Sequence, residues 1–215
     1  MAIKTRSGRP RKGEEEARRD QLLDHAMQLF AEHGYGNLSL ETIAREAHVS
    51  LRTIYRHFGG KADLFGAVVH RVSDEFVAGL PLEKIRSRPM EEVLVDFGRI
   101  FLGRIGRPEC ARLRALILAE AQRFPELAAE FYRNGPERTL RRLSQFFAMQ
   151  QEAGRVIEAD SRFLAGQFIS ALRGEHFQRQ QLGLEQPFAE TEIDAWVKQV
   201  VRHFLYGCLK SEGAR

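Results

Sequence analysis

Hydrophobic residues recur at helical spacing along almost the whole chain. In the first segment Leu23, Ala26, Met27 and Phe30 follow the i, i+3, i+4, i+7 pattern of one buried helix face, and Gly34 stands where a left-handed helix cap is expected. No convincing stretch alternates apolar and polar residues as a half-buried strand would. The pattern therefore predicts an all-α protein.

Four helices are expected in the N-terminal part. Serine is a favoured N-cap because its side chain accepts a hydrogen bond from a free backbone N–H group, and paired glycines interrupt a helix. These signals place the helices at about residues 18–33, after Ser39, from Ser50 to Phe58, and from Lys61 onward. Two prolines between Gly79 and Pro89 then mark a boundary.

A larger helical part is expected beyond this boundary. The predicted segments cover about residues 90–105, 109–123, 125–152, 160–182 and 189–210. Asn134-Gly135-Pro136 should kink or split the third of these, because proline cannot donate to the helix ladder. We divide the chain into a basic arm expected to be disordered when free (residues 1–16), a small helical domain (17–77) and a larger helical domain (78–215).

The segment from Leu51 to Phe58 has two different faces. At about 100° per residue, Leu51, Ile54 and Phe58 gather on one side, with Tyr55 at its border, and Arg52, Thr53, Arg56 and His57 gather on the other. A short connection joins this helix to the one before it. Two helices joined in this way form a helix-turn-helix, which places its second helix in the DNA major groove.

Each polar residue type on this face has a use on DNA. Arg52 can bind guanine O6 and N7, and Thr53 can contact a thymine methyl group or a phosphate. Tyr55 and His57 suit phosphate oxygens, and Lys61 adds its charge to the positive end of the fourth helix. The candidate DNA-binding residues are Arg9, Arg11, Ser39, Thr42, Ser50, Arg52, Thr53, Tyr55, Arg56, His57 and Lys61.

Plainer interpretations remain open for these residues. Arg52 and Arg56 can form a solvated face that pairs with Glu41 or Glu46. Tyr55 can be an aromatic residue at the edge of the core, and His57 a surface histidine. Gly8-Arg9-Pro10-Arg11-Lys12 resembles the minor-groove core of AT-hook segments, and it is also what a solubilising tail contains.

Composition narrows the function classes. The 215 residues carry a net charge of +4, which fits a polyanionic partner without requiring one. No run approaches the ~20 apolar residues of a membrane span and no secretory signal is present, so a cytoplasmic protein without a membrane partner is expected. Cys110 and Cys208 are far apart and suit reduced, buried thiols. No motif of a nucleotide-binding, metal or catalytic site appears, so neither an enzyme nor a cofactor is expected.

The run from Gln21 to Phe65 resembles the N-terminal domain of the TetR/AcrR transcriptional regulators. Its matching elements are Phe30 to Tyr35, Ile43-Ala44, Val49-Ser50, Thr53 to Phe58 and Lys61 to Leu64. The resemblance implies that the residues assigned to DNA are those such regulators use, and that the C-terminal helices bind a ligand and dimerise. His48 departs from the pattern, where the family usually has Gly, and so does Arg56, where an aromatic residue is frequent.

The C-terminal part carries wide apolar stripes in its last two helices. Such stripes can form a four-helix interface with a second copy, or they can pack only within one chain. RFPELAAEFYRNGPERTLRRL resembles the C-terminal domains of AefR-like regulators. The expected protein is a homodimeric repressor that leaves a palindromic operator when a small molecule binds. The alternatives are an activator or ligand-independent regulator of the same fold and, more distantly, a helical enzyme. Candidate ligand-lining residues are Phe97, Phe101, Leu116, Phe124 and Phe168.

Overall fold

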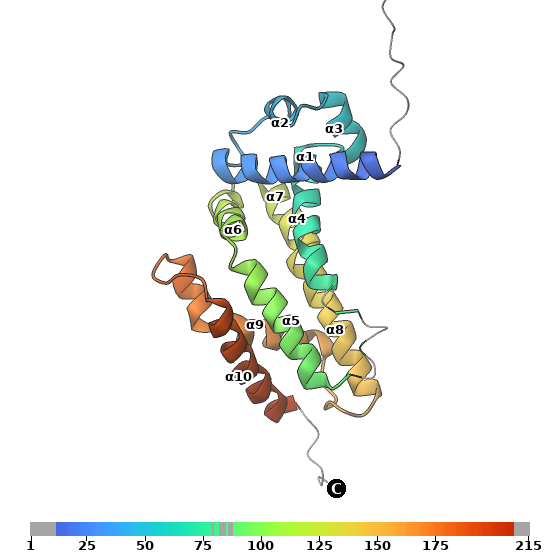
Figure 1. Ribbon diagram of the computed structural model, residues 1–215, viewed down its shortest axis with the longest axis vertical. Coiled ribbons are helices and arrows are strands. Elements are labelled where there is room, and N and C mark those ends of the chain that lie inside the picture. The colour runs from blue at the N-terminus through green and yellow to red at the C-terminus, as the bar shows by residue number, and fades with distance from the viewer. Residues whose placement is uncertain (1–11, 79, 82–84, 86–87, 209–215) are drawn as a thin grey trace, which may run out of the picture.

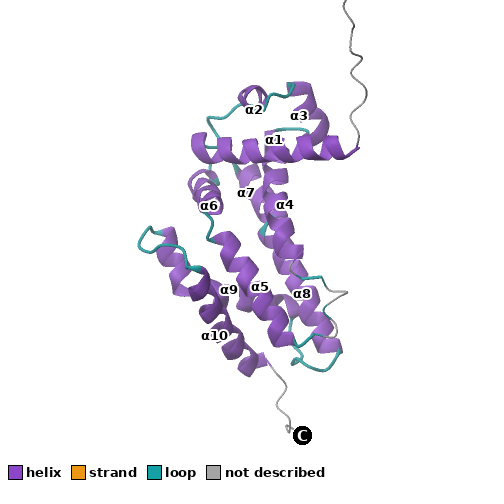
Figure 2. Cartoon of the chain, in the orientation of Figure 1, coloured by secondary structure: helices purple, strands orange, loops and turns teal. Residues whose placement is uncertain are grey.

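The computed structural model describes residues 12–78, 80–81, 85 and 88–208, and within these ranges it contains ten helices and no strand (Figures 1 and 2). The predicted all-α fold is confirmed. The helices are α1 Lys12–His33, α2 Leu40–Glu46, α3 Leu51–Phe58, α4 Lys61–Ala78, α5 Met90–Ile105, α6 Pro108–Glu120, α7 Pro125–Asn134, α8 Pro136–Glu152, α9 Ser161–Gln181 and α10 Glu190–Cys208. Among the described helices, none combines the length and apolar character needed to cross a bilayer.

The first helix begins earlier than the apolar pattern indicates. It starts at Lys12 instead of near residue 18, so residues 12–16 of the expected disordered arm are helical. Glu15 and Glu16 fall close to its N-terminal end, where carboxylates interact favourably with the helix dipole. Arg9 and Arg11 lie outside the described residues.

The predicted caps hold the next helices in place. The Ser39 side chain accepts a hydrogen bond from the backbone N–H of Thr42 at 3.1 Å, and Ser50 accepts one from Thr53 at 3.1 Å. Between the two helices His48 has φ 54°, so histidine occupies the left-handed conformation that the family pattern fills with glycine. We call α1–α3 together with the first half of α4 the head.

The core of the head includes residues from the second half of the chain. Phe30, Ile43, Ile54 and Phe65 are fully buried, and α6 and α7 add apolar side chains to the same cluster: Leu113, Ile117 and Leu127. In Figure 1, α1 runs across the molecule, with α2 and α3 above it and with α4, α6 and α7 beneath it. The head therefore rests on the larger part of the chain through a shared core.

A second core joins α5, α8, α9 and α10. Phe97, Phe147 and Phe168 are fully buried in it. Its unexpected feature is a kink in α9 at Gly174, which has φ 53° and ψ −166°. The indole N–H of Trp196 donates to the carbonyl of Leu172 at 2.8 Å, and a Cβ on Gly174 would lie 2.7 Å from Trp196 Cζ2. Glycine is needed here both for the backbone angles and for the close approach of the indole.

Candidate DNA-binding surface and effector cavity

Helix α3 is held by one face and exposes the other. Ile54 is fully buried in the head, and Leu51 and Phe58 pack against the same cluster. On the opposite side Arg52 and Arg56 are exposed, and the side chain of Tyr55 is 52% exposed at the border. An α-helix with one free polar face of this size fits a major groove about 12 Å wide.

The two exposed arginines have no acidic partner in the described part of the chain. Glu46 pairs instead with Arg45, whose Nε lies 3.3 Å from its carboxylate, and Glu41 forms no ion pair with Arg52 or Arg56 there. The Arg56 guanidinium lies 3.1 Å from Nε2 of His57. The solvated-face interpretation therefore lacks the ion pairs that it invokes, and both charges remain available to phosphates or bases.

The remaining polar candidates lie around this helix. His57 is also exposed, and its Nε2 is 3.9 Å from a carboxylate oxygen of Glu15 on α1. The capping hydroxyls are paired with the next threonine: Ser39 Oγ lies 3.1 Å from Thr42 Oγ1, and Ser50 Oγ lies 2.7 Å from Thr53 Oγ1. These residues hold the starts of α2 and α3, and their contact with DNA stays a prediction.

Lys61, predicted to bind a DNA phosphate, also has a structural role. Its ammonium donates to the carbonyl of Tyr35 at 2.7 Å and to the carbonyl of Leu38 at 3.0 Å, and it lies 4.3 Å from the centre of the Tyr35 ring. Burial lowers the pKa of Lys61. Because an ammonium has three N–H donors, one is left for a phosphate. Lys61 thus fixes the loop between α1 and α2.

Glu120, at the end of α6, holds the same loop from the other side. Its Oε1 accepts a hydrogen bond from the backbone N–H of Tyr35 at 3.0 Å, and its Oε2 accepts one from Gly36 at 2.7 Å. Phe124 packs on the Tyr35 ring with the ring centres 5.3 Å apart, and Leu116 joins the core of the head. Leu116 and Phe124, expected to line a ligand site, therefore pack against the head.

A cavity of about 480 Å³ lies among helices α4 to α9. Its wall is mainly apolar, and its size and lining are typical of small-molecule sites. Of the five predicted lining residues, Phe101 lines it. Phe97 and Phe168 do not, because they are fully buried in the neighbouring core. Helical periodicity shows which residues face inward, but it does not separate a filled core from a cavity.

Sequence reasoning missed three groups of residues that this geometry brings forward. Glu120 is separated from the loop that it holds by more than 80 residues, and no local signal links them. Arg114 and Arg173 line the cavity although charged residues are expected on surfaces. Cys110 also lines it, and burial raises the pKa of its thiol. Among the described residues, no cluster of three or more His, Cys, Asp or Glu side chains is placed to hold a metal ion.

Two protein-family models match the chain. The model for bacterial regulatory proteins of the tetR family matches residues 22–68, and the model for the C-terminal domain of AefR-like transcriptional repressors matches residues 92–207, more than half of the chain. The chain belongs to the TetR family. The resemblance seen in the sequence is confirmed, and so is the expectation of a non-enzyme, because the matched TetR-family proteins are transcriptional regulators.

Curated relatives of this TetR-family chain match it over part of their length. The HTH-type transcriptional regulator TcmR of Streptomyces glaucescens is 30% identical over 123 residues, which are 55% of this chain and 54% of TcmR. The HTH-type transcriptional repressor ComR of Escherichia coli strain K12 is 33% identical over 98 residues, 45% of each protein. The chain thus spans about half the length of these relatives.

Solved TetR-family structures match over most of the chain. A TetR-family transcriptional regulator from Mesorhizobium loti MAFF303099 has a TM-score of 0.76 and 25% identity, covering 96% of this chain and 100% of that one. The flavonoid-responsive regulator FrrA has a TM-score of 0.73 and 33% identity, covering 90% of this chain and 98% of FrrA.

Proposed function

We propose that this TetR-family protein is a homodimeric, sequence-specific DNA-binding repressor that leaves a palindromic operator when a small molecule binds. The proposed DNA binding rests on the arrangement of α3. Its buried Ile54 fixes the helix, while Arg52 and Arg56 extend into solvent without acidic partners in the described part of the chain. Such a protein works on the bacterial chromosome and hence in the cytoplasm.

The last two helices support dimerisation. Besides their buried faces they expose large apolar side chains, with Phe163 on α9 59% exposed and Tyr206 on α10 76% exposed. A second copy would cover them in a four-helix interface. Two recognition helices about one DNA turn (~34 Å) apart then read a palindrome. Sedimentation of the chain as a monomer at micromolar concentration would contradict this assembly.

The route from ligand to DNA runs through α6. Leu113 and Arg114 line the cavity, and Glu120 at the other end of the same helix holds the loop that leads into α2. A molecule in the cavity that shifts α6 therefore moves the head. It releases DNA to the extent that it binds the shifted arrangement better than the operator-bound one. The name of FrrA, a flavonoid-responsive regulator, supports an effector for this chain as well.

The DNA-binding part is tested by substituting the exposed arginines. Fragments selected from random DNA define the operator, and Arg52→Ala and Arg56→Ala are then compared on operators changed at single positions. If the arginine reads a base, its substitution should cost about 1–3 kcal/mol of binding free energy and relax specificity at one operator position. If it binds a phosphate, the substitution should weaken binding to all sequences evenly and reduce the slope of log affinity against log salt by about 1. Arg155→Ala, an exposed arginine in the loop after α8, is the control. Wild-type binding by both α3 variants would refute the assignment.

A further inference from the structure

Two arginines line the large cavity, and no acidic side chain is among the described residues of its wall. Arg114 comes from α6 and Arg173 from α9. Both guanidinium groups approach the Phe177 ring, with their central carbons 4.7 Å and 5.2 Å from its centre, and Arg173 also lies 5.7 Å from the centre of the Phe101 ring. The two cations are therefore neighbours in an aromatic setting.

Within the described residues, most N–H donors of Arg114 and Arg173 have no acceptor. Arg114 donates from Nη1 to the carbonyl of Ile105 at 3.3 Å. The Nε of Arg173 is buried and meets no acceptor in the described part of the chain, and neither arginine forms an ion pair there. A guanidinium carries five N–H donors. Burial, followed by the charge of Arg114, lowers the pKa of Arg173, as expected for a cation without an anion beside it.

Two neighbouring guanidinium groups in a mainly apolar cavity are unfavourable unless other groups offset their charge. Buried charges in proteins are normally paired, and two like charges in a site of low polarity repel each other. Contact with aromatic rings offsets part of this cost. A carboxylate would offset more, because it accepts paired, charge-assisted hydrogen bonds from guanidinium groups.

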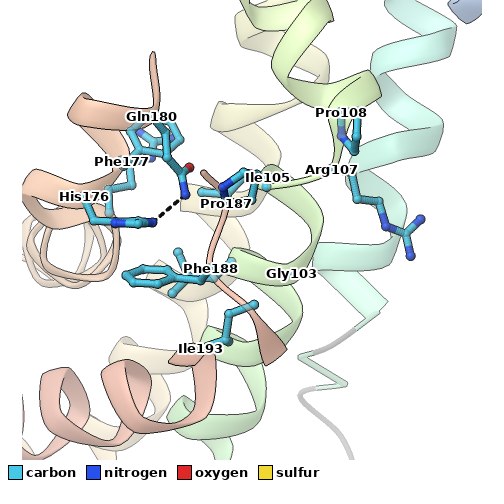
Figure 3. A pocket seen from close by; sticks show the side chains of 13 residues that line it. Gly103, Ile105, Arg107, Pro108, His176, Phe177, Gln180, Pro187, Phe188 and Ile193 are labelled. Carbon is cyan, nitrogen blue, oxygen red and sulfur yellow. Dashed lines mark hydrogen bonds between the residues drawn. The ribbon is translucent and has the colours of Figure 1, made fainter. Parts of the chain in front are cut away.

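A smaller cavity extends the site on the other side of Arg173. It measures about 290 Å³ and shares Ile105, Arg173 and Phe177 with the large one. Figure 3 shows His176 and Phe188 facing one another in it, with their ring centres 3.5 Å apart, and a hydrogen-bonding contact of 2.6 Å between His176 Nε2 and Gln180. The described residues of its wall include no acidic side chain either. Arg173 thus stands between two largely apolar spaces.

We propose that the effector is an amphipathic organic carboxylate whose head group binds Arg114 and Arg173 and whose apolar body fills the large cavity. This proposal deepens the proposed function, since it rests on the cavity being the effector site. Apolar side chains surround the space beyond the arginines: Val72, Phe76, Leu113, Leu140 and Ile169. Gly166 leaves the wall open, because no described atom outside its own helix lies within 4 Å of where its Cβ would stand.

Matched acid and amide pairs test the head group. The probes are 4-phenylbutyrate, decanoate and naphthalene-1-acetate, each compared with its primary carboxamide, which has nearly the same shape without the charge. Binding is measured by calorimetry and by the fluorescence of Trp196, the chain's single tryptophan, which lies near Phe188. At least one acid should bind about tenfold or more tightly than its amide, as a charged hydrogen-bonded pair predicts. The absence of such a preference in all three pairs overturns the proposal.

Substitutions of the two arginines test whether they cause the tighter binding of the acids. Arg114→Met and Arg173→Met should each reduce the ratio of acid affinity to amide affinity severalfold. Arg114→Lys and Arg173→Lys should keep part of this ratio. Arg112→Met is the matched control on α6, because Arg112 is exposed and does not line the cavity. Thermal melts show that each variant is folded. A preference that survives both methionine variants overturns the site. The titrations contain no DNA, so they stand apart from a separate mobility-shift assay of operator binding.

Discussion

Glu120→Gln tests whether α6 holds the head through the loop between α1 and α2. In the wild type both carboxylate oxygens accept backbone hydrogen bonds, from Tyr35 at 3.0 Å and Gly36 at 2.7 Å. Glutamine has one acceptor oxygen, and its amide nitrogen would face the second N–H group. The substitution therefore removes one charge-assisted hydrogen bond and weakens the other, while the size of the side chain stays the same.

The expected loss follows from the strength of these bonds. A hydrogen bond to a charged group contributes about 1.5–3 kcal/mol, so Glu120→Gln should lower the free energy of unfolding by about that amount. For a chain of this length the melting temperature should fall by roughly 3–12 °C. Urea unfolding and thermal melts at one fixed protein concentration measure both quantities, because the proposed dimer would make them concentration-dependent.

Glu126→Gln is the control for charge. Glu126 is exposed at the start of α7 and acts electrostatically on Tyr35, but its side chain makes no hydrogen bond in the described part of the chain. Its substitution should cost less than about 1 kcal/mol, mainly through the helix dipole. Equal losses in the two variants, or a Glu120→Gln protein within about 0.5 kcal/mol of wild type, would refute the role of Glu120.

Three further substitutions probe the interior. Gly174→Ala should lower the free energy of unfolding in urea by about 2–4 kcal/mol, because alanine disfavours φ 53°, ψ −166° and its Cβ would meet Trp196. A loss below about 1 kcal/mol would contradict this. Gln150→Met should stabilise it by about 1–3 kcal/mol, since the buried Gln150 amide has no partner in the described part of the chain; a lower melting temperature would count against this. Burial, helped by nearby carboxylates, raises the pKa of Tyr35 to about 12. The folded state therefore holds the phenol proton more tightly than the unfolded chain does. The stability that this proton contributes is present below pH ~10 and is lost as the pH rises toward 12. Between pH 10 and pH 12 the free energy of unfolding of the wild type should fall by up to about 2 kcal/mol more than that of Tyr35→Phe, and parallel pH profiles would exclude the effect.

Local signals predicted most of the helix boundaries. Serines at the N-cap positions set the starts of α2 and α3, and α7 ends and α8 begins around Pro136, where the sequence predicted a kink or split. These signals act within a few residues, so one sequence is enough to recognise them. The two faces of α3 were also predictable, because burial of Ile54 and exposure of Arg52 follow from helical geometry alone.

Contacts between distant segments were not predictable in this way. Glu120 accepts from a loop 84 residues away in the sequence, and the cations of Arg114 and Arg173 meet at Phe177. The kink at Gly174 depends on the Trp196 indole, which belongs to the next helix. Each of these features needs two elements to be placed in space, and the apolar pattern of either element is satisfied without the other.

The shared core of the head limits how this protein can be recombined with its relatives. Leu113, Ile117 and Leu127 lie far beyond residue 77, yet they bury the same apolar surface as Phe30 and Phe65. A fragment cut at residue 77 would expose that surface to water. A chimaera that transplants the head onto the C-terminal part of another family member would need matching side chains at all three positions. Exchange between family members should therefore succeed most often when α6 and α7 travel with the head.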